Sequence, residues 1–263
     1  MKPKRILVAN RGEIALRVMR ATREMGHIPL AIYSTADRNS LHVARADAAF
    51  CVGEAPSVHS YLKIDAVMDA AKKMKADALH PGYGFLSEKA DFAKAVNEAG
   101  LVFIGPSAKA ISMMGDKVEA RRSMSTSGGL PLVPGTKDGL TDEKEAFKFA
   151  KEIGFPLMVK ELAGGGGRGM RLVMKEDEFS NLFQRAYSEA SKAFGDGRLY
   201  LERYVTSPHH IEVQVIADSH GNVCHLFDRE CSVQRRHQKV IEEATSPFMT
   251  ETTRAKLCEA AVQ

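Results

Sequence analysis

The sequence predicts an α/β protein in which a doubly wound parallel sheet is followed by a second α/β part with a glycine-rich loop. Short apolar segments alternate with helical segments over residues 5–104, which is the pattern of parallel strands joined by crossover helices. Five of the six residues from Gly164 to Gly169 are glycine, and apolar segments lie on either side. Beyond Gly197 apolar and polar residues alternate as they do in strands.

Composition and charge narrow the class of protein. The chain has 263 residues, 44% of them apolar and 27% charged, which suits a globular protein of one large or two modest domains. The net charge of +4 suits anionic small substrates, but dispersed basic residues and the absence of Trp do not favour a nucleic-acid partner. The four cysteines lie far apart, and neither a signal core nor a membrane-spanning apolar run is evident. We therefore expect a reduced, cytoplasmic protein without nucleic-acid or membrane partners.

The N-terminal part alternates strands and helices. The predicted strands are Arg5–Ala9, Ile28–Tyr33, Phe50–Val52, Ala78–His80 and Leu101–Ile104. The predicted helices lie near Ile14–Met25, Ile64–Lys75 and Asp91–Ala99. This order indicates a parallel sheet with crossover helices.

Two residues at strand ends raise functional alternatives. Asp37 follows the second strand, where a dinucleotide-binding fold places its ribose-binding acid, so an NAD or NADP enzyme is one alternative. The G-x-G-x-x-G fingerprint is absent and Gly12 alone does not replace it, so we interpret the scaffold as a nucleotide fold without that fingerprint. His80 opens the Pro/Gly-rich turn His80–Phe85 at a ligand-binding edge. No acid or nucleophile is close in sequence, so the structural interpretation of His80 is favoured.

Residues 106–135 form a predicted linker between lobes, because Gly and Pro are frequent in GGLPLVPG. Lys117 begins a helical stretch inside it. A solvated lysine is the ordinary interpretation, but a cation at a helix start opposes the helix dipole, and a bound anion would relieve this. Helices near Asp142–Ile153 and Asp177–Phe194 flank the glycine loop and complete a small lobe.

The glycine loop joins two apolar segments, Pro156–Lys160 and Met170–Met174, so it reads as strand, loop, strand. It therefore differs from the P-loop and the dinucleotide turn, which both open a helix. Backbone N–H groups of such a flap can bind phosphate oxygens while Lys160 supplies a positive charge. A flexible hairpin tip is the alternative, but an ordinary hairpin turn needs only one or two glycines.

The C-terminal part is predicted to be rich in strands. Leu199–Tyr204 carries Glu202, and the alternation of His210–Val215 places His210, Glu212 and Gln214 on one face, which could also simply meet solvent. The segment Asn222–Asp228 is expected to pair with it through a turn at Ser219–Gly221, and a helix should begin near Thr250.

A run of polar donors follows from Arg229 to Lys239. If its last part is extended, Arg235, His237 and Lys239 share one face and could hold two anions. A solvated basic strand is the alternative. A nucleic-acid patch is a further one, but no aromatic residues are interleaved.

These segments together resemble the biotin carboxylase component of biotin-dependent carboxylases, which are members of the ATP-grasp superfamily. The matching motifs are ANRGEIALR from Ala9, HPGYGFLSE from His80, FIGPSA from Phe103, MGDK from Met114, GGGGRGM from Gly164 and RECSVQRRHQKVIEEA from Arg229. The resemblance implies a pre-ATP-grasp N-terminal domain followed by an incomplete ATP-grasp fold. The corresponding ranges are a domain 1–105, a linker 106–135, a small lobe with the flap 136–203 and the start of a truncated C-terminal lobe 204–263.

The resemblance also implies a reaction and a set of site residues. Bicarbonate attacks the γ-phosphoryl group of ATP to give carboxyphosphate, which delivers CO2 to biotin on a carrier protein or domain; a carboxyltransferase then uses the product. The implied ATP-binding residues are Lys117, Lys160, Gly166, Gly167, Glu202, Arg203, Tyr204, Val205, His210, Gln234 and His237. Lys239 would hold bicarbonate. Mg2+ or Mn2+ is expected with ATP, and the resemblance admits a homodimer.

The chain departs from the family pattern in two places. Glu161 and Leu162 stand where the family usually has a small residue and a small or hydroxyl-bearing one, although strand alternation should turn Glu161 away from the Lys160 face. The family's metal-binding carboxylates, catalytic arginine and general base follow the point that matches Gln263, so we expect no metal ligand within this chain and no turnover by it alone. It would then be a truncation, a fragment or part of a split enzyme. Another ATP-grasp ligase and a non-catalytic nucleotide-binding protein remain alternatives.

Overall fold

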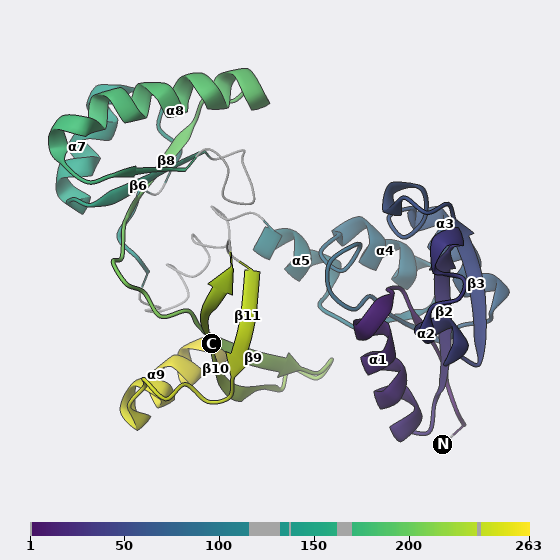
Figure 1. Cartoon of the computed structure of the whole chain (residues 1–263). Helices are drawn as coiled ribbons and strands as arrows, with labels where there is room; N and C mark the ends of the chain where they lie inside the picture. The colour runs from purple at the N-terminus through teal and green to yellow at the C-terminus, as the bar shows by residue number, and fades with distance from the viewer. Residues whose placement is uncertain (1, 116–131, 137, 162–169, 236–237) are drawn as a thin grey trace. The chain divides into compact units, whose positions relative to one another are not determined.

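The structure, a computed structural model, describes residues 2–115, 132–136, 138–161, 170–235 and 238–263. The chain divides into two compact units, Met1–Ala120 and Arg121–Gln263. Among the described residues the first unit has one sheet and the second has two (Figure 1). Each unit also has its own apolar core. Among the described residues, no helix combines the length and the apolar character that crossing a bilayer requires.

The first unit contains the predicted parallel sheet. Its strands, in spatial order, are β3 (Ala48–Gly53), β2 (Ile28–Ser34), β1 (Arg5–Val8), β4 (Ala78–His80) and β5 (Val102–Phe103), and every pairing is parallel. The chain moves outward from β1 in one direction through β2 and β3 and then in the other through β4 and β5. The doubly wound prediction is therefore confirmed, with the switch point between β1 and β4.

Helices cover both faces of this sheet because adjacent strand residues point to opposite sides. On one side α3 (Ile64–Lys73) and α4 (Ala90–Glu98) pack on a core that includes Leu7, Leu30 and Phe92. On the other side α1 (Gly12–Glu24) packs on Val8 and Ala31. The short helices are α2 (Leu41–Ala44), η1 (Thr35–Asp37) and η2 (Ser57–His59).

A further helix, α5 (Ala108–Gly115), lies inside the predicted linker range. Its residues Ala108 and Ile111 pack against the core of the first unit. The beginning of that range is therefore helical and attached to the N-terminal sheet.

The second unit begins with a small antiparallel sheet of order β7 (Arg171–Val173), β6 (Leu157–Glu161), β8 (Leu199–Arg203). Helix α7 (Glu143–Ile153) is capped by Asp142, whose carboxylate accepts the Glu145 N–H at 2.8 Å. Helix α8 (Phe179–Phe194) follows η3 (Glu176–Glu178). The core between the helices and one sheet face contains Leu157, Val159, Val173, Phe179, Phe183, Leu199 and Leu201. The strand, loop, strand prediction is confirmed at both strands, while residues 162–169 lie outside the described residues.

The last part of the chain is a second antiparallel sheet of order β11 (Gln238–Glu243), β10 (Val223–Arg235), β9 (Ile211–Ala217). The predicted turn is confirmed, because Asp218 accepts the N–H groups of His220 and Asn222. Helix α9 (Glu251–Val262) is capped by Thr250. Exposed apolar side chains are numerous here: Val215, Ile216, Val223, Leu226, Phe227, Val233, Val240 and Ile241.

One prediction for this sheet is wrong. Arg235 and Lys239 do not lie on one extended strand, because β10 ends at Arg235 and β11 begins at Gln238. The antiparallel register instead places Gln234 opposite Lys239 and Arg235 opposite Gln238. Residues directly opposite one another in a sheet share a face, so Gln234 is the side chain that accompanies Lys239. His237, the third member of the predicted face, lies outside the described residues.

Candidate functional site

The first candidate site lies on the small sheet of the second unit. The pairing of β6 with β8 places Met158 opposite Glu202 and Lys160 opposite Tyr200, on the face away from the lobe's core. Lys160 Nζ donates to Glu202 Oε2 at 3.0 Å, and the two side chains are 34% and 21% exposed. Glu161 is opposite the buried Leu199 and therefore lies on the other face, as strand alternation predicted. The lysine thus stands at the end of the strand that leads into the glycine run.

The residues after Glu202 are anchored by their backbones. Arg203 donates its N–H to Pro134 O at 2.7 Å, and Tyr204 donates its N–H to Pro156 O at 3.0 Å. The Arg203 guanidinium donates to Ile153 O at 2.7 Å, so it braces the end of α7. Val205, by contrast, is exposed. The backbone N–H groups of Arg203 and Tyr204 are therefore hydrogen-bonded to backbone carbonyls of the small lobe.

The second candidate site is a polar cluster on the β9–β11 sheet. Glu212 accepts hydrogen bonds from Lys239 and from the Arg229 guanidinium, whose Nε lies 2.8 Å from Glu212 Oε1. Arg229 also approaches Glu242 at 3.4 Å and Gln214 at 3.2 Å. The predicted common face of Glu212 and Gln214 is confirmed, because a single guanidinium contacts both. Arg229 was not among the predicted site residues, and the register of β9 and β10 places it opposite Glu212.

The ionisation of this cluster follows from its contacts. Burial opposes ionisation of Glu212, but hydrogen bonds from Lys239 and Arg229 outweigh it and lower the pKa of that carboxyl. The hydrogen bond to Glu212 raises the pKa of Lys239, so the ammonium remains charged. Burial raises the pKa of the Cys231 thiol, which is therefore protonated at neutral pH and a poor nucleophile.

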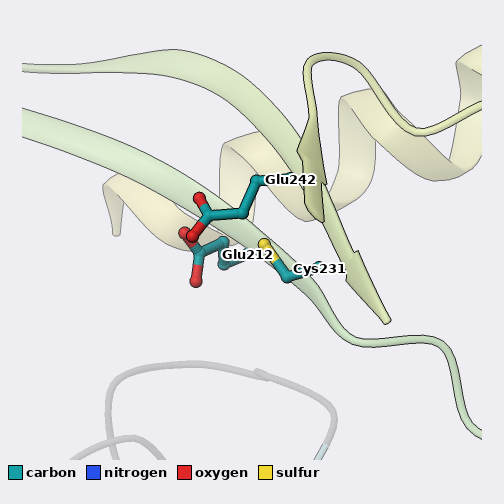
Figure 2. A group of neighbouring side chains, drawn as sticks. All are labelled: Glu212, Cys231 and Glu242. Atoms are coloured by element: carbon teal, nitrogen blue, oxygen red, sulfur yellow. The ribbon is translucent and has the colours of Figure 1, made fainter. Parts of the chain in front are cut away.

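The same cluster contains a geometric candidate for a metal site. Figure 2 shows Glu212, Cys231 and Glu242, whose ligand atoms lie within 4.8 Å of one another. Arg229 contacts both carboxylates and Lys239 contacts one of them, so cations already neutralise the group. Mg2+ requires oxygen ligands in octahedral geometry, and a thiol does not supply one. The group is therefore an ion-pair network, and it does not fit Mg2+.

His210 and Gln234 adjoin this cluster. The Gln234 amide donates to His210 Nδ1 at 3.0 Å and to Cys231 O at 2.9 Å, and His210 Nε2 lies 3.9 Å from Glu212 Oε2. The structure thus brings His210, Gln234 and Lys239 together in one sheet around Glu212. Four predicted site residues lie outside the described residues: Lys117, Gly166, Gly167 and His237.

Asp37, which follows β2 in the first unit, has a structural role. Asp37 accepts hydrogen bonds from Tyr61 at 2.6 Å, Ser34 at 2.9 Å and Arg11 at 3.2 Å. Burial would raise the pKa of Asp37, but these donors outweigh it and lower that pKa. A carboxylate held by three protein donors is poorly placed to bind a ribose, so the dinucleotide alternative is not favoured.

His80 also has a structural role in the described residues. Its Nδ1 accepts the Gly82 N–H at 3.0 Å, and burial lowers the pKa of the imidazole. Both observations agree with the structural interpretation of this turn.

Known proteins resemble the chain over its whole length. Residues 2–111 match the family model "Biotin carboxylase, N-terminal domain", and residues 116–263 match "Carbamoyl-phosphate synthase L chain, ATP binding domain". A biotin carboxylase of Nostoc sp. is 51% identical over 263 residues, which are 100% of this chain and 59% of the relative.

Solved structures agree with these matches. The chain is similar to a Campylobacter jejuni biotin carboxylase in a β,γ-ATP complex, with a TM-score of 0.89, 49% identity and coverage of 98% of this chain and 58% of that one. It is also similar to the biotin carboxylase domain dimer of Hydrogenobacter thermophilus 2-oxoglutarate carboxylase with MgADP, ADP and bicarbonate, with a TM-score of 0.86, 46% identity and coverage of 98% and 57%. The chain therefore spans somewhat more than half the length of these relatives.

Proposed function

The chain belongs to the biotin carboxylase family, and from this we propose that it serves the ATP-dependent carboxylation of carrier-bound biotin with bicarbonate, through carboxyphosphate. The single observation that carries the proposal is the Lys160–Glu202 pair on the outer face of the β6–β8 sheet, next to the glycine run. A lysine ammonium at that position can bind a phosphate group, and a carboxylate beside it can accept hydrogen bonds from donors of the ribose or the base.

The nucleotide site proposed here combines residues of both sheets. Lys160 would hold phosphate with Lys117 and the flap residues Gly166 and Gly167. Glu202 and the segment Arg203, Tyr204 and Val205 would contact adenine, with His210, Gln234 and His237 completing the site. The support comes from the contacts among the described members and from the MgADP that the Hydrogenobacter thermophilus relative binds.

Bicarbonate is proposed to bind at Lys239. The ammonium has three donors, and the hydrogen bond to Glu212 uses one of them, which leaves capacity for a small anion. Glu212 at the same time limits the site's positive charge, which disfavours larger polyanions. The bound bicarbonate in the Hydrogenobacter thermophilus relative supports a site of this class.

Phosphoryl transfer depends mainly on positioning and charge neutralisation, so these residues would bind and orient the reactants. Mg2+ or Mn2+ would accompany ATP and neutralise the triphosphate. The Glu212, Cys231 and Glu242 group does not fit such an ion, so no step is assigned to a metal site of the described residues. Biotin on its carrier protein or domain, a carboxyltransferase and a second copy of the chain are the proposed partners.

A cytoplasmic location is part of the proposal. The four cysteines, Cys51, Cys224, Cys231 and Cys258, are free thiols, as is usual in a reducing compartment.

The test is calorimetric titration of the chain with ATP, followed by assays of phosphate release with and without bicarbonate and biotin when the remaining length of the relatives is supplied. Saturable ATP binding is expected, with 13C NMR detecting bicarbonate binding that Lys239→Met abolishes and Lys256→Met, on the exposed face of α9, leaves unchanged. Absence of ATP binding would overturn the proposal. Two outcomes of the hydrolysis assays would favour the alternatives. ATP hydrolysis that depends on bicarbonate but is not stimulated by biotin would favour another ATP-grasp ligase. ATP binding without any bicarbonate-dependent hydrolysis, even when the remaining length of the relatives is supplied, would favour a non-catalytic nucleotide-binding protein.

A further inference from the structure

Glu230 is a buried carboxylate in β10 that has no role in the proposed chemistry. Its side chain is 5% exposed. One oxygen accepts from the Ser232 hydroxyl and from the Ser232 N–H at 3.3 Å, and the other accepts from the Ser246 hydroxyl at 2.8 Å. His209 Nδ1 lies 3.5 Å from the first oxygen. A buried charge is stable only when donors surround it, so this site is built for a carboxylate.

Ser232 connects Glu230 to His210. The Ser232 hydroxyl oxygen accepts the backbone N–H of His210 at 2.7 Å. A hydroxyl has one proton, and here that proton is committed to Glu230, so its lone pairs are available to the His210 N–H. Cys231, the residue before Ser232, donates its backbone N–H to His210 O at 2.8 Å. Both backbone groups of His210 are therefore held by β10.

The ring of His210 has a defined tautomer in this arrangement. The Gln234 amide nitrogen lies 2.9 Å from Cys231 O and 3.0 Å from His210 Nδ1. Because Cys231 O can only accept, the atom facing it must be the NH2 group, and the same NH2 group then donates to Nδ1. The proton of the neutral imidazole is therefore on Nε2, the nitrogen 3.9 Å from Glu212 Oε2.

We propose that Glu230 is a positioning residue which, through the Ser232 hydroxyl, holds the His210 backbone so that its ring stays in the Nε2–H form beside the Glu212 and Lys239 cluster. A carboxylate is required because the two serine hydroxyls donate to separate oxygens of Glu230. A glutamine at this position could accept from only one of them and would present an amide donor to the other. The effect of Glu230 on nucleotide binding rests on the proposed function. Its effect on the tautomer of the His210 ring does not.

Two-dimensional NMR of the 15N-labelled histidine rings tests the inference in the absence of any nucleotide. In the unsubstituted chain His210, assigned by its loss in His210→Gln, is expected to be a single Nε2–H tautomer. Glu230→Gln should shift the ring nitrogens and give a mixture of tautomers. Ser232→Ala should have the same effect. The double variant should shift the ring signals no further than either single variant, since both substitutions interrupt the same chain of hydrogen bonds from Glu230 through Ser232 to His210. Glu243→Gln is the matched control, because Glu243 is exposed on β11 directly opposite Glu230.

Unchanged His210 ring signals in folded Glu230→Gln would overturn the inference. If that variant does not fold by circular dichroism, Ser232→Ala decides, and an unchanged ring in it overturns the inference equally. Titration with ATP then separates this inference from the proposed function. Roughly 3- to 10-fold weaker binding in Glu230→Gln is expected, the size of one hydrogen bond. A changed ring with unchanged ATP affinity would support the positioning role and overturn the assignment of His210 to the nucleotide site.

Discussion

Lys160 and Glu202 form an ion pair across the neighbouring strands β6 and β8, with Nζ and Oε2 separated by 3.0 Å. Each charge lies on the sheet face away from the hydrophobic core, and each is partly shielded from solvent. The pair keeps both charges compensated in the absence of ligand, and a phosphate group would give the ammonium a second anionic partner.

Lys160→Met is expected to weaken ATP binding roughly 10- to 100-fold, the value of a hydrogen bond to a charged group. Isothermal titration calorimetry measures this. Lys148→Met is the matched control, because Lys148 is an exposed lysine of α7 in the same lobe. Equal affinities of the Lys160 variant and the unsubstituted chain would show that this cation does not contact the nucleotide.

Gly82→Ala and Gly84→Ala should differ in cost although both glycines have positive φ, +67° and +65°. A Cβ on Gly82 would lie 2.7 Å from Asn10 Nδ2, which is fixed by 2.8 Å hydrogen bonds to Pro81 O and Tyr83 O. A Cβ on Gly84 meets nothing within 4 Å. Urea denaturation should show a loss of about 1 kcal/mol for Gly84→Ala from backbone strain alone and about 1–3 kcal/mol more for Gly82→Ala. Equal losses would mean that Asn10 moves freely.

Leu201→Ala should destabilise the small lobe by about 2–5 kcal/mol, because Leu201 is 0% exposed and opposite Val159 in the core. Leu172→Ala on β7 is the control, since Leu172 is 37% exposed, and it should cost less than about 1 kcal/mol. Denaturant titration monitored by circular dichroism compares them. A similar loss in both variants would contradict the assigned core.

The Asp228–Arg254 contact should make stability depend on pH. Burial would raise the pKa of Asp228, but hydrogen bonds from Ser246 N–H and Arg254 outweigh it and lower that pKa below 3.8. The folded chain thus binds this proton less readily than the unfolded chain. The contribution is fully present above the ordinary pKa of 3.8 and is lost as the pH falls through the lower, folded pKa.

Asp228→Asn should therefore reduce the melting temperature most at neutral pH, and the difference from the unsubstituted chain should shrink below pH ~4. Differential scanning calorimetry at several pH values measures it, with Glu259→Gln on the exposed face of α9 as control. A difference that is constant with pH would contradict the role of this carboxylate.

The regular elements could be predicted from the sequence because their periodicity is local. Ala78–His80 begins with two apolar residues and is followed by a Pro/Gly-rich turn, and it is a strand with the predicted limits. β10 is longer than predicted, since it continues to Arg235. The polar residues Arg229 and Glu230 belong to this strand. Arg229 pairs with Glu212 on β9, and the buried Glu230 accepts hydrogen bonds from serines.

The arrangement of the candidate sites was only partly predictable. The pairing of Lys160 with Glu202 follows from two strands being neighbours, which residue spacing does not reveal. The shared face of Gln234 and Lys239 depends on the antiparallel register of β10 and β11, which residue spacing does not reveal. The relay from Glu230 to His210 joins residues on different strands, so it is visible only in three dimensions.

The buried apolar side chains are divided between separate cores, so we expect the two units to unfold in separate transitions. Leu7, Leu30 and Phe92 belong to the core of the first unit, whereas Leu157 and Leu201 belong to a core of the second. Heating should then give a calorimetric trace with more than one peak, and damage to one half should leave the melting of the other in place. A variant that lowers only the melting of the first unit can therefore leave the second unit folded, so a loss of ATP binding and a loss of folding can be told apart.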